Sequence, residues 1–298
     1  MQILTQRLQA LAQKRLNVSN YNITSQWLIG FIEAEGSFIG KKGQQPYLHI
    51  SQHTADWFLM EAIAKFIGYG NVKVQTRKDG RSEAILIIND KDVLRNKIIP
   101  MCQSNLKSIK KFNQFNEWVK NHFSDLAEPL RVSAPINSKI DNQWIVGFTD
   151  GDGSFYPMFH KAKDYKYGYQ IQATFDLAQL DIEQELLNSI GNQLSNGAHK
   201  WAKSGNTQHM RIVRLETCLS YIEPFFIENP LQSRKQYDFI IWQEILNLMK
   251  SKKHLTEDGI TIIRELQALQ NQYRLSVPES VINPISKLID NSLFINLG

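Results

Sequence analysis

Long apolar runs, paired cysteines and several familiar enzyme signatures are missing from this sequence of 298 residues. No segment approaches the roughly 18 consecutive apolar residues of a transmembrane helix, so we expect no membrane contact. Cys102 and Cys218 lie far apart without CxxC spacing, which argues against a disulfide framework and a zinc site. We expect two buried thiols in a reducing compartment. The sequence also offers no P-loop, no HExxH and no defensible Ser-His-Asp arrangement.

The first 18 residues lack the apolar core and the small-residue cleavage site of a signal peptide. They are basic and contain no acid, a composition that a transit peptide shares, but we predict an ordinary solvated leading helix. The formal net charge of +5 favours a polyanionic partner. Charge alone does not identify that partner, because many basic proteins bind no nucleic acid.

An internal duplication is the strongest organisational signal. Residues 27–38 read WLIGFIEAEGSF and residues 144–155 read WIVGFTDGDGSF, with six of the twelve positions identical. An acid matches an acid at two more positions, Glu33 with Asp150 and Glu35 with Asp152. Downstream, NLKSIKKFNQFNEW, which ends at Trp118, matches NPLQSRKQYDFIIW, which ends at Trp242. Ordered matches of this kind indicate a duplicated module.

The duplication divides the chain. We predict a first repeat with an N-terminal extension over residues 1–123, and a second repeat with a C-terminal helical tail over residues 141–298. The segment between them, residues 124–140, contains two prolines and several small polar residues, which is typical of a linker.

Hydrophobic patterning predicts an α+β fold in each repeat. Thr24 and Asp141 are good N-cap residues, and Gly36 and Gly153 are placed to end the helices that follow. Alternating apolar and polar residues predict antiparallel strands with one apolar face and one polar, basic face over 47–53, 71–78, 84–90 and 168–177. Helical spacing recurs over 55–67, 92–99, 110–121, 181–190 and 234–250.

Small residues lie four apart in both duplicated helices, as Gly30 and Ala34 and as Gly147 and Gly151. Positions i and i+4 share one helix face, and a face without bulk lets two backbones approach closely. We therefore expect the helix to pack against its own copy around a pseudo-twofold axis. This packing brings the two helix C-termini together.

Glu35 and Asp152 stand at those ends, one residue before the terminal glycines. A helix C-terminus disfavours negative charge, and two neighbouring carboxylates raise each other's pKa. A divalent cation removes both penalties, and oxygen ligands favour Mg²⁺, with Mn²⁺ able to substitute. For Glu33 and Asp150, a purely structural role and a functional one stay equally open.

The duplicated motifs resemble a known family. LIGFIEAEG (28–36) and IVGFTDGDG (145–153) look like two copies of the LAGLIDADG motif of homing endonucleases. NPLQSRKQYDFIIW is similar to the lysine-containing helix start of intron-encoded members, and residues 248–267 are similar to a C-terminal segment of the single-chain branch. The resemblance covers about residues 21–270 and implies two pseudo-symmetric αββαββα domains with saddle-shaped antiparallel sheets.

The resemblance also implies the site. It assigns metal binding to Glu35 and Asp152 with main-chain carbonyls near Ala34 and Gly151, and it places a catalytic basic residue near each scissile phosphate, namely Lys111 and Lys235. Lys110 and Arg234, one place earlier, are the nearest competitors and are counted as DNA-binding candidates.

The implied activity is metal-dependent hydrolysis of both strands of a long, non-palindromic double-stranded DNA target, which leaves 3′ overhangs. A monomer is expected, because both repeats lie in one chain. The alternative is an RNA-binding maturase of the host intron, or both activities in one protein, and a second alternative is a non-catalytic DNA-binding regulator. Richness in Asn, Ile and Lys, together with the habits of the family, favours a mitochondrion, with another organelle left open.

DNA recognition is expected from the polar strand faces, because the major groove alone distinguishes all four base pairs. For each residue, base reading stays open beside two alternatives, a contact to phosphate and mere solvation. The candidates in the first repeat are Lys41, Tyr47, His49, Lys73, Gln75 and Arg77. The candidates in the second repeat are Lys161, Lys166, Gln170, Gln172, Lys200, Lys203 and Arg211.

Overall fold

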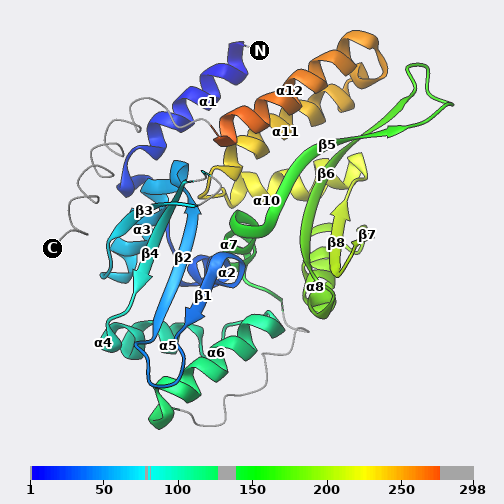
Figure 1. Cartoon of the computed structure of the whole chain (residues 1–298). Helices are drawn as coiled ribbons and strands as arrows, with labels where there is room; N and C mark the ends of the chain where they lie inside the picture. Colours follow the sequence, from blue (N-terminus) through cyan, green and yellow to red (C-terminus); the bar gives the residue numbers. More distant parts are fainter. Residues whose placement is uncertain (1, 78–79, 81, 127–138, 276–298) are drawn as a thin grey trace.

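The computed structural model describes residues 2–77, 80, 82–126 and 139–275. Two units of similar architecture lie on either side of a central helix pair, α2 and α7 (Figure 1). One contiguous hydrophobic core runs through both units and the helix pair between them. None of the described helices is long and apolar enough to cross a membrane.

Each unit follows the predicted order of helix, two strands, helix, two strands and helix. In the first unit these elements are α2 (Ser25–Glu35), β1 (Gly36–Ile39), β2 (Tyr47–His53), α3 (Trp57–Ile67), β3 (Val72–Thr76), β4 (Ser82–Ile88), α4 (Lys91–Val93), α5 (Ile99–Cys102) and α6 (Ile109–His122). In the second they are α7 (Asn142–Asp152), β5 (Gly153–Lys161), β6 (Tyr169–Leu180), α8 (Gln184–Ser195), β7 (Lys200–Ser204), β8 (Thr207–Ile212), α9 (Leu215–Thr217), α10 (Glu223–Glu228) and α11 (Lys235–Lys250).

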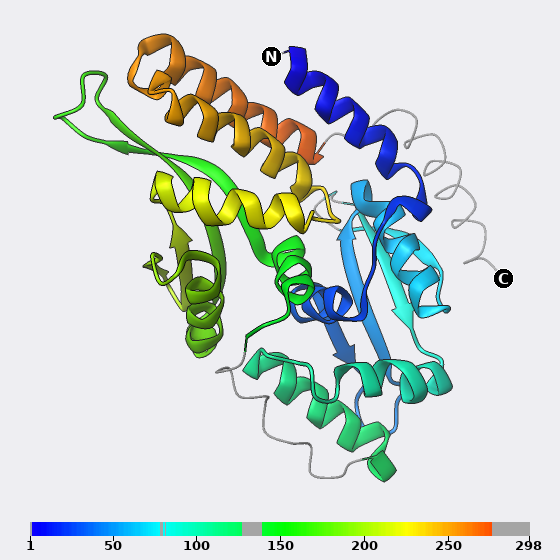
Figure 2. The ribbon, with the colours of Figure 1, turned by 180° about the vertical axis from the view of Figure 1, so that it is seen from behind.

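Two four-stranded antiparallel sheets carry the units, in the orders β1-β2-β4-β3 and β5-β6-β8-β7. The shared order means that the second sheet repeats the topology of the first. Helices of both units lie in front of the sheets when the molecule is seen from behind (Figure 2), whereas the strands face the viewer in Figure 1. Among the described helices, none covers the other face of either sheet, as the polar alternation predicted.

The central helices begin where the sequence predicts. The Thr24 side chain accepts a hydrogen bond from the backbone N–H of Trp27, and Asp141 accepts from Gln143 and Trp144. Side chains at each helix start thus satisfy backbone donors that would otherwise lack partners.

Helices at the two ends of the chain add a layer beside α11. The leading helix α1 (Gln2–Arg15) exists as predicted, but it is not fully solvated, because Leu4 and Leu8 are buried in the core. The tail helix α12 (Glu257–Leu275) packs alongside α11 (Figure 1). Most of the predicted linker, residues 127–138, lies outside the described residues, so the predicted domain boundaries stay a prediction.

Candidate active site

The motif helices α2 and α7 are in backbone contact. A Cβ atom on Gly30 would lie 2.1 Å from the carbonyl oxygen of Trp144, and one on Gly147 would lie 1.9 Å from that of Trp27. Neither distance leaves room for any side chain. The small-residue faces are therefore the helix–helix interface, as the sequence predicted.

The same contact brings the C-terminal ends of the two helices together. A Cβ atom on Gly151 would lie 2.2 Å from the Cβ of Ala34 and 3.0 Å from the Cγ of Glu35. Glu35 of the first repeat thus lies against the residue that precedes Asp152 of the second. One site is built from both repeats.

Glu35 and Asp152 have closely similar surroundings. Both are partly buried, and each accepts a hydrogen bond from a glutamine at the end of a strand, Glu35 from Gln52 (2.9 Å) and Asp152 from Gln179. Burial raises the pKa of Glu35 to about 7 and that of Asp152 to about 6, against the opposing charge of Lys235. The carboxylate of Asp152 contributes to the upward shift of the Glu35 pKa. Loss of both protons is thus costly without a cation.

Lys111 and Lys235 place ammonium groups at the ends of the motif helices. Lys111 Nζ donates to the carbonyl oxygen of Gly36, and Lys235 Nζ donates to those of Asp150 (3.0 Å) and Gly151. Burial lowers the pKa of both lysines, whereas Glu35 and Asp152 raise it. The cations oppose the negative end of each helix dipole and lie beside the paired acids.

Glu33 and Asp150 have a structural role next to the site. Glu33 is 5% exposed and accepts from the backbone N–H groups of Lys107 and Ser108 and from the indole of Trp144 across the interface. Asp150, 1% exposed, accepts in the same way from Gln232, Ser233 and the indole of Trp27. These contacts fasten the segments that lead into α6 and α11, so of the two roles left open the structural one is observed.

Gln52 and Gln179 were missed by the sequence analysis. Along β2, Gln52 follows the buried Ile50 on the same strand face, and along β6, Gln179 follows the buried Leu177. The available signal was a polar residue at the end of the apolar face of each strand. Such a residue indicates a side chain directed at the ends of the motif helices. It could have been found by aligning the two strand ends.

The described residues contain no group of three or more His, Cys, Asp or Glu side chains that could hold a metal ion. The available metal ligands are the two carboxylates and the main-chain oxygens near Ala34 and Gly151, and the oxygen of Gly151 accepts from Lys235 in this structure. Two partly buried carboxylates with raised pKa values fit a hard divalent cation, because it would replace the protons that they otherwise retain.

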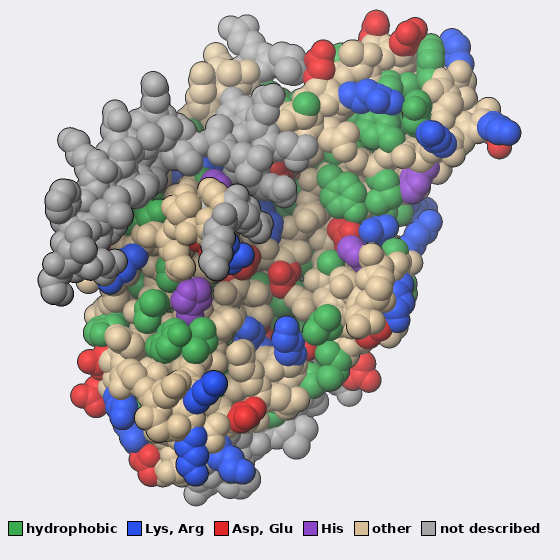
Figure 3. All heavy atoms as spheres, in the orientation of Figure 1, with side chains coloured by type: hydrophobic (Ala, Val, Ile, Leu, Met, Phe, Trp, Pro, Cys, Tyr) green, Lys and Arg blue, Asp and Glu red, His purple; other side chains and the backbone are tan. Residues whose placement is uncertain are grey.

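Most predicted DNA-binding side chains reach solvent. Figure 3 shows lysine and arginine side chains on the open face of the molecule, including its lower end and its right-hand edge. The exposed ones are Lys41, Lys73, Gln75, Arg77, Lys110, Lys161, Lys166, Lys200 and Lys203. The partly exposed ones are Tyr47, His49, Gln170, Gln172 and Arg211.

Arg234 departs from this set. It is 6% exposed, lies with its guanidinium over the Tyr237 ring, and its backbone N–H donates to Asp56. The sequence counted it among the DNA-binding candidates, as the competitor one place before Lys235. Its side chain is buried, unlike those of the other candidates, and its role in DNA binding stays a prediction.

The comparison with known proteins agrees with this geometry. The LAGLIDADG endonuclease family matches residues 28–122 and 145–246. The chain belongs to this family. The resemblance drawn from the two motifs is confirmed, and the prediction of a DNA endonuclease is confirmed with it.

Relatives include proteins named for introns. An uncharacterized cox1 intron-2 protein of 37.2 kDa from Schizosaccharomyces pombe is 26% identical over 266 residues, which cover 89% of this chain and 78% of that protein. The probable intron-encoded endonuclease 4 of Neurospora crassa is 26% identical over 246 residues, which cover 80% of this chain and 42% of the relative. The intron-encoded RNA maturase bI4 of Saccharomyces cerevisiae is 24% identical over 188 residues, which cover 62% and 28%. The chain thus spans less than half the length of endonuclease 4 and of the maturase.

Solved structures share the fold. The I-SmaMI LAGLIDADG homing endonuclease bound to cleaved DNA has a TM-score of 0.68 and 24% identity, covering 85% of this chain and 99% of that one. I-SmaMI bound to an uncleaved DNA target in the presence of calcium ions has a TM-score of 0.67 and 23% identity, covering 84% and 99%. These likenesses confirm the predicted α+β architecture of two similar domains.

Proposed function

We propose that this protein is a site-specific homing endonuclease that makes a metal-dependent double-strand break in DNA. One observation carries the proposal: Glu35 and Asp152, one from each repeat, meet at the ends of two helices that are in backbone contact. Each of these acids has a glutamine partner, and a lysine stands at the end of each helix. Neither repeat alone supplies all of these residues.

Phosphodiester hydrolysis is the reaction that such a site suits. A water oxygen attacks phosphorus, and the bond from phosphorus to one ester oxygen breaks. A divalent ion, for which we propose Mg²⁺, would when bound lower the pKa of the attacking water and neutralise charge on the phosphate. The carboxylates of Glu35 and Asp152, with main-chain oxygens near Ala34 and Gly151, would hold it.

The lysines and glutamines have distinct tasks in this proposal. The ammonium groups of Lys111 and Lys235 stabilise the negative charge that develops on phosphate oxygens. Gln52 and Gln179 donate to the acids and fix the orientation of each carboxylate. A single geometry is thus prepared before DNA binds.

The open sheet faces are the proposed DNA surface. Some of their cations already have acidic partners, as in Arg77 with Glu83 (2.8 Å) and Lys203 with Asp181 (2.6 Å). The exposed lysines of these faces, such as Lys41, Lys73 and Lys200, can neutralise phosphates, which gives affinity without sequence information. Because the two faces differ in sequence, we propose a long, non-palindromic target that is cut to leave 3′ overhangs.

The protein is proposed to act as a monomer in a mitochondrion. Both halves of the site come from one chain, so catalysis requires no second copy. A relative named for an intron of cox1, a gene of mitochondrial genomes, supports this location.

A cleavage selection tests the proposal. The full-length protein is incubated with a randomised duplex library in Mg²⁺ and, in parallel, in Ca²⁺, and the cut molecules are sequenced. We expect one long site to be cut on both strands in Mg²⁺. Glu35→Gln and Asp152→Asn should each abolish double-strand cutting of that site while binding in Ca²⁺ changes less than about threefold, since they remove ligands for the metal rather than contacts to the bases. Normal cutting by either variant would disprove the assignment of the two acids.

A maturase is the second candidate, favoured by the similarity to the RNA maturase bI4. If no duplex in the library is cut and the protein instead binds structured host-intron RNA tightly, the maturase replaces the endonuclease. Cleavage together with tight RNA binding would indicate both activities.

A further inference from the structure

The helices that carry the two lysines each begin against a carboxylate from the other repeat. Glu183 lies at the end of a 3₁₀ turn, η5 (Asp181–Glu183), in the second repeat. It accepts hydrogen bonds from the hydroxyl of Ser108 (2.9 Å) and the backbone N–H groups of Ile109 (3.0 Å) and Lys110 (2.8 Å). These donors form the first turn of α6, which belongs to the first repeat.

The reciprocal contact exists at α11. Asp56 lies at the end of the equivalent 3₁₀ turn, η2 (Thr54–Asp56), in the first repeat, and it accepts from the backbone N–H of Arg234 (2.9 Å). The guanidinium groups of Arg15 and Arg234 lie close enough to lower the pKa of Asp56, which burial raises. Asp56 is 5% exposed and Glu183 is 1% exposed, so neither carboxylate is in contact with bulk water.

These acids do not duplicate Glu33 and Asp150. Within its own repeat, Glu33 binds the N–H groups of residues 107 and 108, and Asp150 binds those of residues 232 and 233. The acid from the opposite repeat takes the donors that follow. The start of each helix that carries a lysine therefore donates hydrogen bonds to two carboxylates, one from its own repeat and one from the other.

The cross-repeat contact reaches the lysines directly. The Ser108 hydroxyl donates to Glu183 and at the same time accepts from the backbone N–H of Lys111 (3.2 Å). On the other side, Asp56 binds the backbone of Arg234, which immediately precedes Lys235. Removal of either carboxylate would leave the helix turn that carries the lysine without its hydrogen bonds to the opposite repeat.

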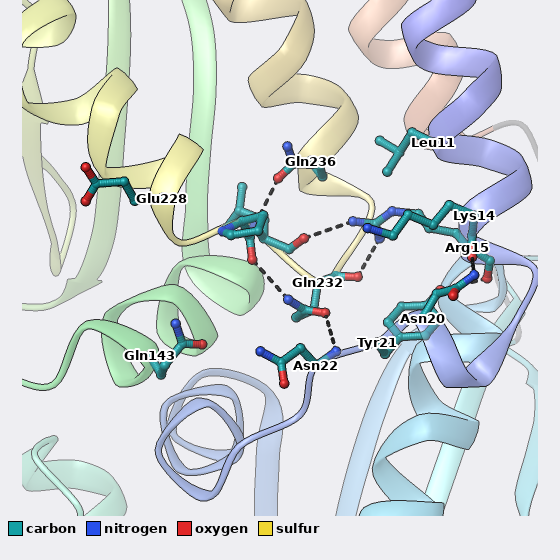
Figure 4. A pocket seen from close by; sticks show the side chains of 12 residues that line it. Leu11, Lys14, Arg15, Asn20, Tyr21, Asn22, Gln143, Glu228, Gln232 and Gln236 are labelled. Carbon is teal, nitrogen blue, oxygen red and sulfur yellow. Dashed lines mark hydrogen bonds between the residues drawn. The ribbon is translucent and has the colours of Figure 1, made fainter.

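Further bonds hold the segment before α11 to the first repeat. The Arg15 guanidinium donates to the carbonyl oxygens of Leu231 (3.0 Å) and Gln232, and the backbone N–H of Asn22 donates to the Gln232 side chain (3.0 Å). Figure 4 shows these groups around a pocket between α1 and the loop that precedes α11. Several of the polar groups drawn there bind each other across the boundary between the repeats, namely Arg15 and Asn22 of the first repeat with the segment 231–232 of the second.

We propose that Asp56 and Glu183 are positioning residues that each hold the lysine of the opposite repeat in its catalytic place. Glu183 therefore acts on the same DNA strand as Lys111, and Asp56 on the same strand as Lys235. This inference rests on the proposed nuclease function.

Strand-resolved cleavage tests it. A duplex recovered from the Mg²⁺ selection carries a different fluorophore on each strand, and single-turnover nicking of both strands is followed with the full chain. Lys111→Met and Lys235→Met first establish which strand each lysine serves. We expect Glu183→Gln to slow the Lys111 strand roughly 10- to 100-fold, and Asp56→Asn to slow the Lys235 strand by a similar factor, because small misplacements of a reacting group have effects of this size. The other strand should change less than about threefold in each case.

Controls separate positioning from general weakening. Asp90 caps α4 through the N–H groups of Asp92 and Val93 (both 2.9 Å), and α4 carries no lysine of the site, so Asp90→Asn should leave the ratio of the two strand rates unchanged. DNA affinity in Ca²⁺ should stay within about threefold for Asp56→Asn and Glu183→Gln. If Glu183→Gln fails to fold, Glu183→Asp keeps the charge one methylene shorter and should show the same strand preference in milder form.

Three results have distinct meanings. Failure of the wild-type protein to cut any duplex refutes the proposed function. If the wild type cuts normally, two results for Glu183→Gln refute the positioning role. One is equal slowing of both strands, and the other is slowing of the strand that Lys235→Met slows. The positioning role is supported if Glu183→Gln slows the strand that Lys111→Met slows, and Asp56→Asn slows the strand that Lys235→Met slows.

Discussion

Glu33 and Glu35 lie two positions apart in one helix, yet they have opposite surroundings. Glu33 faces backbone and indole donors and is 5% exposed, whereas Glu35 is partly buried beside Asp152 and Lys235. Asp150 and Asp152 repeat this division in α7. Helix geometry explains it, because positions two apart project from different faces. Only the pair at the helix junction meets across the interface.

The paired acids predict a pH-dependent stability. Folding raises the pKa of Glu35 from 4.5 to about 7 and that of Asp152 from 3.8 to about 6, so the folded protein binds protons more tightly than the unfolded chain. Without divalent metal, the contribution of these two groups to the free energy of unfolding should therefore fall as pH rises from about 4 to about 7 and then level off. Each group contributes up to about 3 kcal/mol to this loss. Urea unfolding in EDTA at a series of pH values measures it.

The double variant Glu35→Gln/Asp152→Asn provides the comparison. It should be more stable than the wild type at pH 8 and differ little at pH 4, since other buried acids contribute equally to both proteins. Addition of Ca²⁺ at pH 8 should stabilise the wild type and leave the variant unchanged. Parallel pH curves for the two proteins would contradict the assigned pKa shifts.

At the scale of elements, the contact of α2 with α7 sets the position of everything else in the site. The carbonyl oxygens of Trp27 and Trp144 occupy the space that a side chain on Gly147 or Gly30 would need. Backbone atoms of a helix cannot rotate aside as a side chain can. The contact therefore tolerates glycine alone at these two positions.

Gly147→Ala should destabilise the protein by about 3 kcal/mol, because overpacking costs roughly 1–3 kcal/mol and a rigid backbone neighbour places this site at the upper end of that range. The higher helix propensity of alanine offsets about 1 kcal/mol at most. Thermal or urea unfolding of the full chain measures the loss.

Gly151 supplies the matched control. A Cβ atom there meets the Cβ of Ala34 at 2.2 Å, which is a side-chain atom that can be removed. Gly151→Ala should destabilise the chain, and addition of Ala34→Gly should restore most of the loss. No single substitution of Trp27 should restore Gly147→Ala, because the obstacle is a backbone oxygen. Rescue of Gly147→Ala by a side-chain change would show that the helices can separate.

Sequence reasoning was most successful where a pattern is local. Caps, strand alternation and helix spacing depend on neighbours in the chain, and the motif comparison then predicted the meeting of Glu35 and Asp152. It missed Gln52 and Gln179, although the strand pattern offered a signal for them. It also missed the approach of Asp56 to Arg234, because that contact joins segments whose separation in sequence carries no periodic signal. Long-range pairing of side chains is settled only by the relative placement of elements.

At the scale of the whole molecule, the two repeats complete each other. The indole of Trp144 donates to Glu33 and that of Trp27 to Asp150, and the helix starts at α6 and α11 are each bound by an acid from the opposite half. Separation would expose the apolar face of each motif helix and leave buried carboxylates without partners, which is costly.

Residues 1–123 and residues 141–298, produced as separate chains, should therefore each cut neither strand of the selected duplex. Each should also unfold at lower urea concentration than the intact protein, because the interface between the repeats is lost. Mixing the two chains should recover some cleavage. Efficient nicking by either half alone would contradict a composite site, and circular dichroism of each half shows whether loss of activity accompanies loss of structure.

The crossed binding of helix starts restricts how such proteins can be recombined. A chimaera that joins the first half of this chain to the second half of a relative must match three sets of partners at once. These are the glycine–carbonyl contacts of α2 and α7, the indole–carboxylate pairs, and the bonds at the helix starts, where Asp56 must bind the relative's helix and the relative's counterpart of Glu183 must bind α6. Sheet faces, by contrast, take no part in these contacts and can be exchanged separately. New target specificity should therefore be transferred strand by strand, with the junction of the two halves kept from a single parent.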